Sequence, residues 1–153
     1  MEWKNFTLIG LGLIGGSIAK VIKKTYPKAR ISVLEKDQHS VEMAISEGII
    51  EKGLQSIEEI PADTELLFLC TPVEWNRKFL RELAPKLSSH TLLTDVGSTK
   101  RSIMEEAEAL GLSSRFCGGH PMAGSESSGY KASDSLLLEN AYYLLTPGQG
   151  FST

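Results

Sequence analysis

A glycine-rich turn near the N-terminus limits the folds open to this chain more than any other feature. The segment GLGLIGG (10–16) follows an apolar run at 6–10 that is typical of a short strand. It opens a segment, 13–26, in which apolar residues recur at helical spacing until Pro27 stops the pattern. Its G-x-G-x-x-G pattern is formed by Gly10, Gly12 and Gly15. Strand, tight turn and helix in this order predict the start of a βαβ unit.

The rest of the chain repeats this alternation of short β-rich runs with helical patterns. We expect further strands at 30–37, 65–70, 91–98, 114–119 and 140–147, and further helices at 39–48, 71–87 and 100–111. The run ELLFLC (65–70) is almost continuously apolar, as expected of a central parallel strand covered on both faces. The pattern predicts an α/β fold: a doubly wound, mostly parallel Rossmann-type sheet with helices on both faces, in one domain over 1–153.

Composition narrows the classes of partner. The chain has 16 Lys and Arg against 19 Asp and Glu, for a net charge of −3, so it offers no basic field for nucleic acid or a membrane surface. No apolar run is long enough to span a bilayer, and the start MEWKNF does not resemble a signal peptide. We therefore expect a cytoplasmic protein. Cys70 and Cys117 lack disulfide or zinc spacing and are interpreted as reduced, structural residues.

The glycine turn, in this context, predicts a dinucleotide site. Gly10 permits the turn, Gly12 lets a pyrophosphate approach the backbone, and Gly15 allows close helix–strand packing. The amides at the start of the helix then face the phosphates. Glu35 lies 20 residues after Gly15, where an acid accepts hydrogen bonds from the adenosine ribose and repels a 2′-phosphate, which favours NAD over NADP. The alternative is a turn that only packs helix against sheet, and Lys36 could attract a 2′-phosphate.

Ligands of such sheets bind beyond the carboxyl ends of the strands. The segments CTPV (70–73) and DVGS (95–98) fall there, so Thr71, Pro72 and Ser98 are expected to line the ribose and nicotinamide side, unless they are simply turn residues. The predicted cofactor-binding residues are Gly10, Gly12, Leu13, Ile14, Gly15, Glu35, Thr71, Pro72 and Ser98.

A nicotinamide cofactor implies hydride transfer, which needs a group to take the hydroxyl proton. His120, in GGHPMAGSE (118–126), follows the carboxyl end of the strand predicted at 114–119, whereas His39 and His90 are interpreted as solvated surface residues. Position therefore favours His120 as a catalytic base over a structural histidine. Cys117 and His120 lack a convincing third ligand, so no metal is expected.

Four motifs together resemble the nucleotide-binding domain of the prephenate dehydrogenase family, which includes arogenate dehydrogenases. They are GLGLIGGSIA, CTPV, DVGSTK and GGHPMAGSESSG, in order and at compatible spacing over nearly all 153 residues. The resemblance implies NAD-dependent oxidative decarboxylation of prephenate to 4-hydroxyphenylpyruvate, or of arogenate to tyrosine. It further implies that His120 deprotonates the 4-hydroxyl, that Ser98 is its hydrogen-bonding companion, and that Glu126 with Ser125 lies at the substrate entrance.

The resemblance also implies a helical C-terminal domain that supplies a substrate arginine and the dimer contacts, and we expect that domain to lie outside these 153 residues. Without the resemblance, Glu126 is an ordinary solvated loop acid, and Lys100, Arg101 and Lys131 are interpreted as solvated surface residues. Two rival hypotheses share the fold. One is a β-hydroxyacid dehydrogenase or imine reductase that does not need His120, and the other is a non-catalytic NAD-sensing domain.

Overall fold

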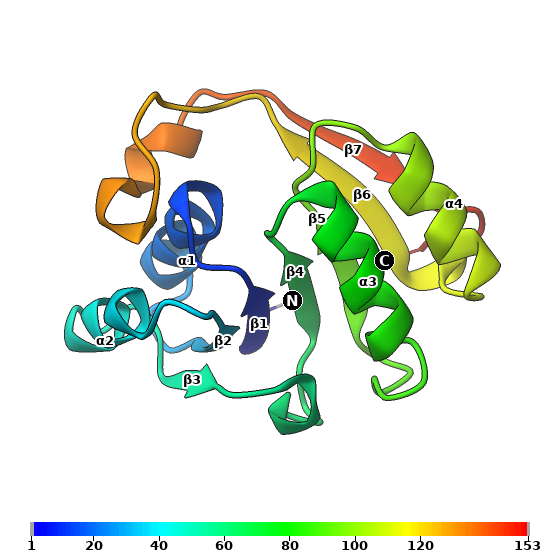
Figure 1. Cartoon of the computed structure of the whole chain (residues 1–153), viewed down its shortest axis with the longest axis horizontal. Coiled ribbons are helices and arrows are strands. Elements are labelled where there is room, and N and C mark those ends of the chain that lie inside the picture. Colours follow the sequence, from blue (N-terminus) through cyan, green and yellow to red (C-terminus); the bar gives the residue numbers. More distant parts are fainter. Residues whose placement is uncertain (1, 153) are drawn as a thin grey trace.

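The computed structural model describes residues 2–152, and its strands and helices alternate along the chain (Figure 1). The strands are β1 (Asn5–Ile9), β2 (Arg30–Leu34), β3 (Lys52–Leu54), β4 (Leu66–Leu69), β5 (Leu92–Asp95), β6 (Phe116–Pro121) and β7 (Tyr143–Pro147). The α-helices are α1 (Leu13–Thr25), α2 (Gln38–Ser46), α3 (Val73–Leu83) and α4 (Arg101–Ala109). Four 3-10 helices lie at Ile57–Glu59, Ser113–Arg115, Tyr130–Ala132 and Ser135–Leu138.

All seven strands form one sheet in the order β3-β2-β1-β4-β5-β6-β7. Neighbouring strands are parallel except β6 and β7, which are antiparallel. The chain winds outward from β1 to β3 and then returns to place β4 on the other side of β1, so the topological switch point lies between β1 and β4. The predicted doubly wound, mostly parallel sheet is confirmed.

Two apolar clusters hold the helices against the sheet. One joins β1 and β2 to α1 and α2 through residues such as Leu8, Val33 and Ile18. The other joins β4 and β5 to α3 and α4 through residues such as Leu67 and Leu80. Burial of these side chains is the main favourable contribution to folding, at about 25 cal/mol per Å² of apolar surface.

The segment between β6 and β7 is anchored on α1 and α2 before the chain returns (Figure 1). Tyr130 is buried, and its hydroxyl donates to Oε2 of Glu47 at 2.8 Å. The Asp134 amide donates to Oγ of Ser17 in α1 at 3.0 Å. The loop that follows His120 is therefore held, near its C-terminal end, by α1. This is the same helix that begins at the glycine turn.

One strand was missed, and several predicted boundaries differ from the structure, two of them near the site. Strand β3 was missed because three residues carry no readable alternation. The strand expected at 114–119 runs on to Pro121, since β7 pairs His120 with Leu144 and Pro121 with Tyr143, so His120 lies within the strand rather than after it. The strand expected at 91–98 ends at Asp95, which leaves 96–98 as a turn.

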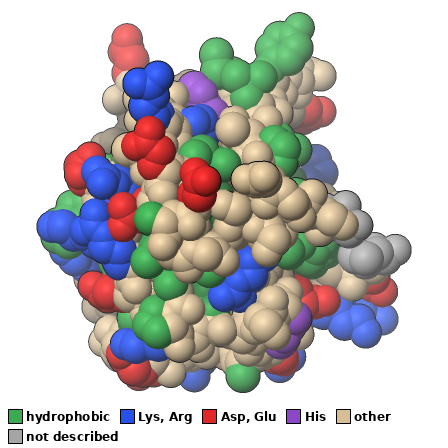
Figure 2. Space-filling model, turned by 90° about the vertical axis from the view of Figure 1, so that its right-hand side faces the viewer, with side chains coloured by type: hydrophobic (Ala, Val, Ile, Leu, Met, Phe, Trp, Pro, Cys, Tyr) green, Lys and Arg blue, Asp and Glu red, His purple; other side chains and the backbone are tan. Residues whose placement is uncertain are grey.

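Within residues 2–152, none of the helices is both long and apolar enough to cross a membrane. Figure 2 shows acidic and basic side chains interspersed over the face that it presents, at the α4 end of the molecule. This distribution agrees with the near-neutral net charge of −3.

Candidate active site

The glycine turn between β1 and α1 has three differently constrained positions. Gly10 has φ of +101°, a left-handed conformation that favours glycine, and a Cβ there would lie 2.7 Å from the Cys70 carbonyl oxygen. A Cβ on Gly15 would lie 2.4 Å from the Gly10 carbonyl oxygen, so this glycine permits close packing of helix and turn. A Cβ on Gly12 would meet nothing within 4 Å. Space inside the domain therefore does not require glycine at position 12.

The first turn of α1 offers amide donors beside Gly12. The first hydrogen bond of the helix runs from the Gly16 amide to the Gly12 carbonyl at 2.9 Å, so the amides of Leu13, Ile14 and Gly15 precede the intrahelical ladder. Such amides, together with the positive end of the helix dipole, attract an anion. The open position at Gly12 lies where that anion would approach.

Glu35 follows β2 directly and reaches back to the glycine turn. Its Oε2 accepts from the Leu11 amide at 2.6 Å, and its Oε1 accepts from the Asp37 amide at 3.1 Å. A carboxylate has about four acceptor positions, so both oxygens keep capacity for hydroxyl donors. Asp37 in turn caps α2, accepting from the His39 amide at 3.2 Å.

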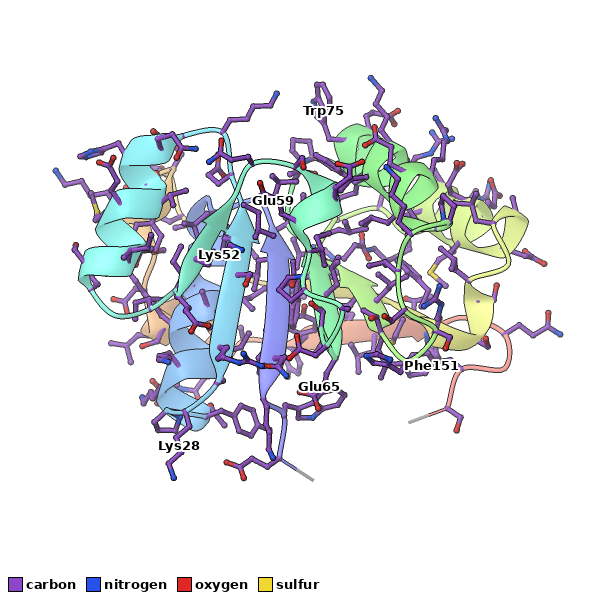
Figure 3. The ribbon with its side chains drawn as sticks, turned by 90° about the horizontal axis from the view of Figure 1, so that it is seen from below. Lys28, Lys52, Glu59, Glu65, Trp75 and Phe151 are labelled. Atoms are coloured by element: carbon purple, nitrogen blue, oxygen red, sulfur yellow. The ribbon has the colours of Figure 1, made fainter. Side chains whose placement is uncertain are left out.

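A cleft of about 900 Å³ opens at this edge of the sheet, between the glycine turn, the end of β2 and the start of α3. Its lining includes five predicted cofactor residues: Gly10, Gly12, Glu35, Thr71 and Pro72. Part of the wall of the cleft is apolar and aromatic, which suits a flat heteroaromatic group; this part consists of Leu54, Ile57, Phe79 and Trp75. Figure 3 shows Trp75 beyond the carboxyl ends of the strands, whereas Lys28 and Glu65 lie beyond their amino ends.

The Trp75 side chain is 47% exposed. The Nζ of Lys36 lies over its ring, 4.8 Å from the ring centroid. The Nζ of Lys78 lies 4.5 Å from the same ring. Both distances are in the range of cation–π contacts. The side chain of Lys36, which the sequence flagged as a candidate for attracting a 2′-phosphate, thus lies over an aromatic ring at the rim of the cleft.

Asn76 supports the cleft and was missed by sequence reasoning. It is fully buried in α3, and its Oδ1 accepts from the Thr71 amide at 3.1 Å and from the Thr71 hydroxyl at 2.5 Å. Its Nδ2 donates to the Leu69 carbonyl at 3.2 Å. The amide group therefore fixes the turn after β4. Its position five residues after a threonine in a helical pattern gave no sign of this role.

The turn after β5 is built around Asp95, which is fully buried. Its carboxylate accepts from Nζ of Lys100 at 2.6 and 2.5 Å, from the Gly97 amide at 3.1 Å and from the Gly119 amide at 3.1 Å. The interpretation of Lys100 as a solvated surface residue was wrong, because its side chain is only 18% exposed and neutralises this carboxylate. Arg101 and Lys131 are exposed, as expected.

Ser98 and His120 lie next to the two glycines that donate to Asp95. Ser98 follows Gly97 and is exposed, and His120 follows Gly119 and is half-buried. Both thus stand at the carboxyl ends of adjacent strands, β5 and β6. Ser125 and Glu126 lie in the exposed loop beyond β6, where the Ser125 hydroxyl accepts from the Ser127 amide at 3.2 Å.

The cysteines and the other histidines stay outside this arrangement. Burial raises the pKa of the Cys70 thiol, as does the nearby Asp95 carboxylate, so this thiol is neutral at neutral pH. Cys117 is buried and free, while His39 and His90 are exposed. Over residues 2–152, no group of three or more His, Cys, Asp or Glu side chains is placed to hold a metal ion.

Glycine turn, helix terminus, following acid and switch-point cleft together define a dinucleotide-binding domain of the Rossmann class. Among known sequence families, the one described as prephenate dehydrogenase, nucleotide-binding domain, matches residues 18–152. The chain therefore belongs to the prephenate dehydrogenase family, as its motifs suggested.

Individual relatives agree. Prephenate dehydrogenase of Bacillus subtilis is 45% identical over 145 residues, covering 93% of this chain and 39% of the relative. The structure of prephenate dehydrogenase from A. aeolicus in complex with hydroxyphenyl propionate and NAD+ has a TM-score of 0.88 and 32% identity, covering 99% of this chain and 53% of that one. Synechocystis arogenate dehydrogenase has a TM-score of 0.87 and 31% identity, covering 97% and 51%. The chain thus spans 39% of the Bacillus relative and about half of each solved structure.

Proposed function

We propose that this chain is the NAD-binding domain of a prephenate dehydrogenase and that it contributes the base of the reaction, His120. The observation that carries the proposal is the convergence on one sheet edge of a dinucleotide cleft and a half-buried histidine two strands away. The substrate would be prephenate, oxidised and decarboxylated to 4-hydroxyphenylpyruvate. The proposal adopts the reaction that the relatives' name describes.

The residues present fit NAD. The amides of Leu13, Ile14 and Gly15 would face the pyrophosphate across the open Gly12, and Glu35 would accept from the ribose hydroxyls. Thr71 and Pro72 would line the path toward the nicotinamide end, near Ser98. When bound, NAD accepts the hydride from the ring carbon that bears the 4-hydroxyl.

The task of His120 is to take the proton of that hydroxyl. As hydride leaves the carbon, the O–H electron pair forms the new C=O bond and the proton passes to an imidazole nitrogen. The carbon–carbon bond to the ring carboxylate then breaks and carbon dioxide leaves. The electron pair of that bond makes the ring aromatic, and the ketone oxygen becomes a phenolate that takes the proton back from the imidazolium to give the phenol. Aromatisation supplies the driving force, so the protein chiefly orients the reacting groups. Ser98 would hold the hydroxyl or the imidazole by a hydrogen bond.

Prephenate carries two carboxylates, which guanidinium groups bind best. We propose that Glu126 and Ser125 flank the substrate entrance, and that a substrate arginine and the homodimer contacts come from a helical domain outside these residues. The proposal keeps the expectation of a cytoplasmic enzyme.

Calorimetric titration with NAD and NADP, side by side, tests the cofactor site. We expect NAD to bind more tightly than NADP. Glu35→Gln is the matched control, because it keeps an oxygen for the Leu11 amide but removes the charge that repels a 2′-phosphate. In this variant the preference for NAD should fall by about tenfold. Absence of binding by either nucleotide, in a folded chain, would contradict the proposal.

The substrate is tested separately. NADH formation with prephenate and with arogenate should distinguish the two, because only the side-chain keto and amino groups differ. The Synechocystis structure, an arogenate dehydrogenase, makes arogenate the second candidate. Turnover is measured in a protein that also contains the helical domain, because the domain of residues 1–153 alone would lack the substrate arginine. In that protein, NAD binding without turnover of either compound would favour another Rossmann dehydrogenase, an imine reductase or an NAD-sensing domain.

A further inference from the structure

We infer that the buried Asp95–Lys100 pair is a positioning device that holds the turn bearing Ser98 and the strand bearing His120 in one fixed arrangement. This inference rests on the proposed function, because it assigns a purpose to the spacing of its two catalytic candidates. It concerns residues that touch neither substrate nor cofactor.

Each oxygen of the Asp95 carboxylate contacts the backbone next to a different candidate. Oδ2 accepts from the amide of Gly97, the residue before Ser98, at 3.1 Å. Oδ1 accepts from the amide of Gly119, the residue before His120, at 3.1 Å. One carboxylate thus ties together two segments that lie more than 20 residues apart in sequence.

The Asp95 side chain links β5 to β6 where the backbone pairing between these two strands has ended. The backbone ladder between β5 and β6 pairs Leu93 with Phe116 and Thr94 with Cys117, and β5 ends at Asp95. Beyond Cys117, β6 continues to Pro121 without a further backbone pair to β5. The Asp95 side chain provides the next bond to β6, at Gly119, just before the histidine.

Lys100 closes the arrangement. Its ammonium donates to both Asp95 oxygens and, at 2.6 Å, to the Gly119 carbonyl. An ammonium has three donors, and these contacts use all three, so Lys100 is not available to bind a substrate carboxylate. Gly119 is therefore held at both its amide and its carbonyl, which fixes the backbone on which His120 is mounted.

The two glycines before His120 make this contact feasible. A Cβ on Gly119 would lie 2.6 Å from the Asp95 carbonyl oxygen, and a Cβ on Gly118 would lie 3.1 Å from Cδ of Lys100. A larger residue at 119 would therefore force β6 away from the Asp95 backbone, whereas one at 118 would require only a small shift of the flexible Lys100 and Met104 side chains. Of the two glycines, Gly119 is the one that this close approach requires.

The test compares Lys100→Met with Lys86→Met, a control that removes a lysine from the exposed Glu58 pair. Three quantities are measured in a protein that also contains the proposed helical domain: kcat for prephenate, the Kd of NAD, and amide hydrogen exchange at Gly97 and Gly119 by NMR. In Lys100→Met we expect kcat to fall about 100-fold, as for a displaced catalytic group. Exchange at both glycines should quicken at least about tenfold. The Kd of NAD should stay within about twofold, since the glycine turn is untouched.

A Lys100→Met protein with unchanged kcat, or with unchanged exchange at both glycines, would overturn the inference. If this variant does not fold, because it leaves a buried carboxylate unpaired, Asp95→Asn replaces it. That isosteric change should lower kcat about tenfold and quicken exchange at Gly97, and an unchanged kcat would overturn the inference. Wild-type protein without prephenate turnover would contradict the proposed function instead, and the exchange rates would then decide the inference alone.

Discussion

Among single residues, the glycines of the turn serve different needs: one is required for packing within the domain, and another leaves room for a ligand. Gly15 lies against the carbonyl of Gly10, and Gly12 lies in open space, although both belong to one short motif. The sequence pattern treats them alike. The structure assigns them different physical requirements, which substitution by alanine can distinguish.

Gly15→Ala should destabilise the fold by about 2 kcal/mol, because its Cβ would overlap the Gly10 carbonyl oxygen. Gly12→Ala should cost less than about 1 kcal/mol, since its Cβ meets no atom, but should weaken NAD binding about tenfold by keeping the pyrophosphate from the helix amides. Urea unfolding and calorimetry measure the two effects. Wild-type NAD affinity in Gly12→Ala would contradict the assignment of this turn.

Among the structural elements, ion pairs between α3 and α4 make a pH-dependent contribution to the free energy of unfolding. The Arg81 guanidinium, which donates to Glu106, holds the pKa of that carboxyl below its ordinary value, and Arg77 adds to the effect. Because the folded pKa is lowered, the contribution is present above the ordinary pKa and is lost as pH falls through the folded one.

Glu106→Gln should therefore reduce the free energy of unfolding by roughly 0.5 kcal/mol at pH 7, the size typical of an ion pair whose arginine is half-exposed. The difference from wild type should shrink when urea unfolding is repeated near about pH 3.5. Glu105→Gln, on an exposed position of the same helix, is the control. A difference that grows on acidification would refute the assigned pair.

Most elements could be predicted because their signals are local. For example, α2 begins at the Asp37 cap and is followed by Gly48, which has φ of +72°. Both residues are adjacent in sequence to the helix whose ends they mark, and both residue types are common at such positions. The extent of β6 could not be predicted, because it depends on pairing with β7, more than 20 residues away. The roles of Asn76 and Lys100 likewise depend on tertiary contacts with other segments, so their burial had no local signature.

For the molecule as a whole, the cleft is lined by residues at the ends of β1, β2 and β4. A bound nucleotide would therefore contact all three strand ends at once. A ligand that binds only the folded state stabilises it by mass action, about 2.7 kcal/mol at 100 times its Kd. For a domain of this length we expect NAD at that concentration to raise the thermal midpoint by about 5–10 °C. Scanning calorimetry measures the shift, and Gly12→Ala at the same NAD concentration should show a much smaller one.

The central claim is that His120 is the base of an NAD-dependent dehydrogenase. The most direct measurement follows NADH formation from prephenate in a protein that also contains the helical domain, with and without the substitution His120→Asn, and with the Kd of NAD measured in both. We expect kcat to fall about 10²- to 10⁴-fold with the Kd of NAD unchanged. A His120→Asn protein that oxidises prephenate as fast as wild type would contradict it.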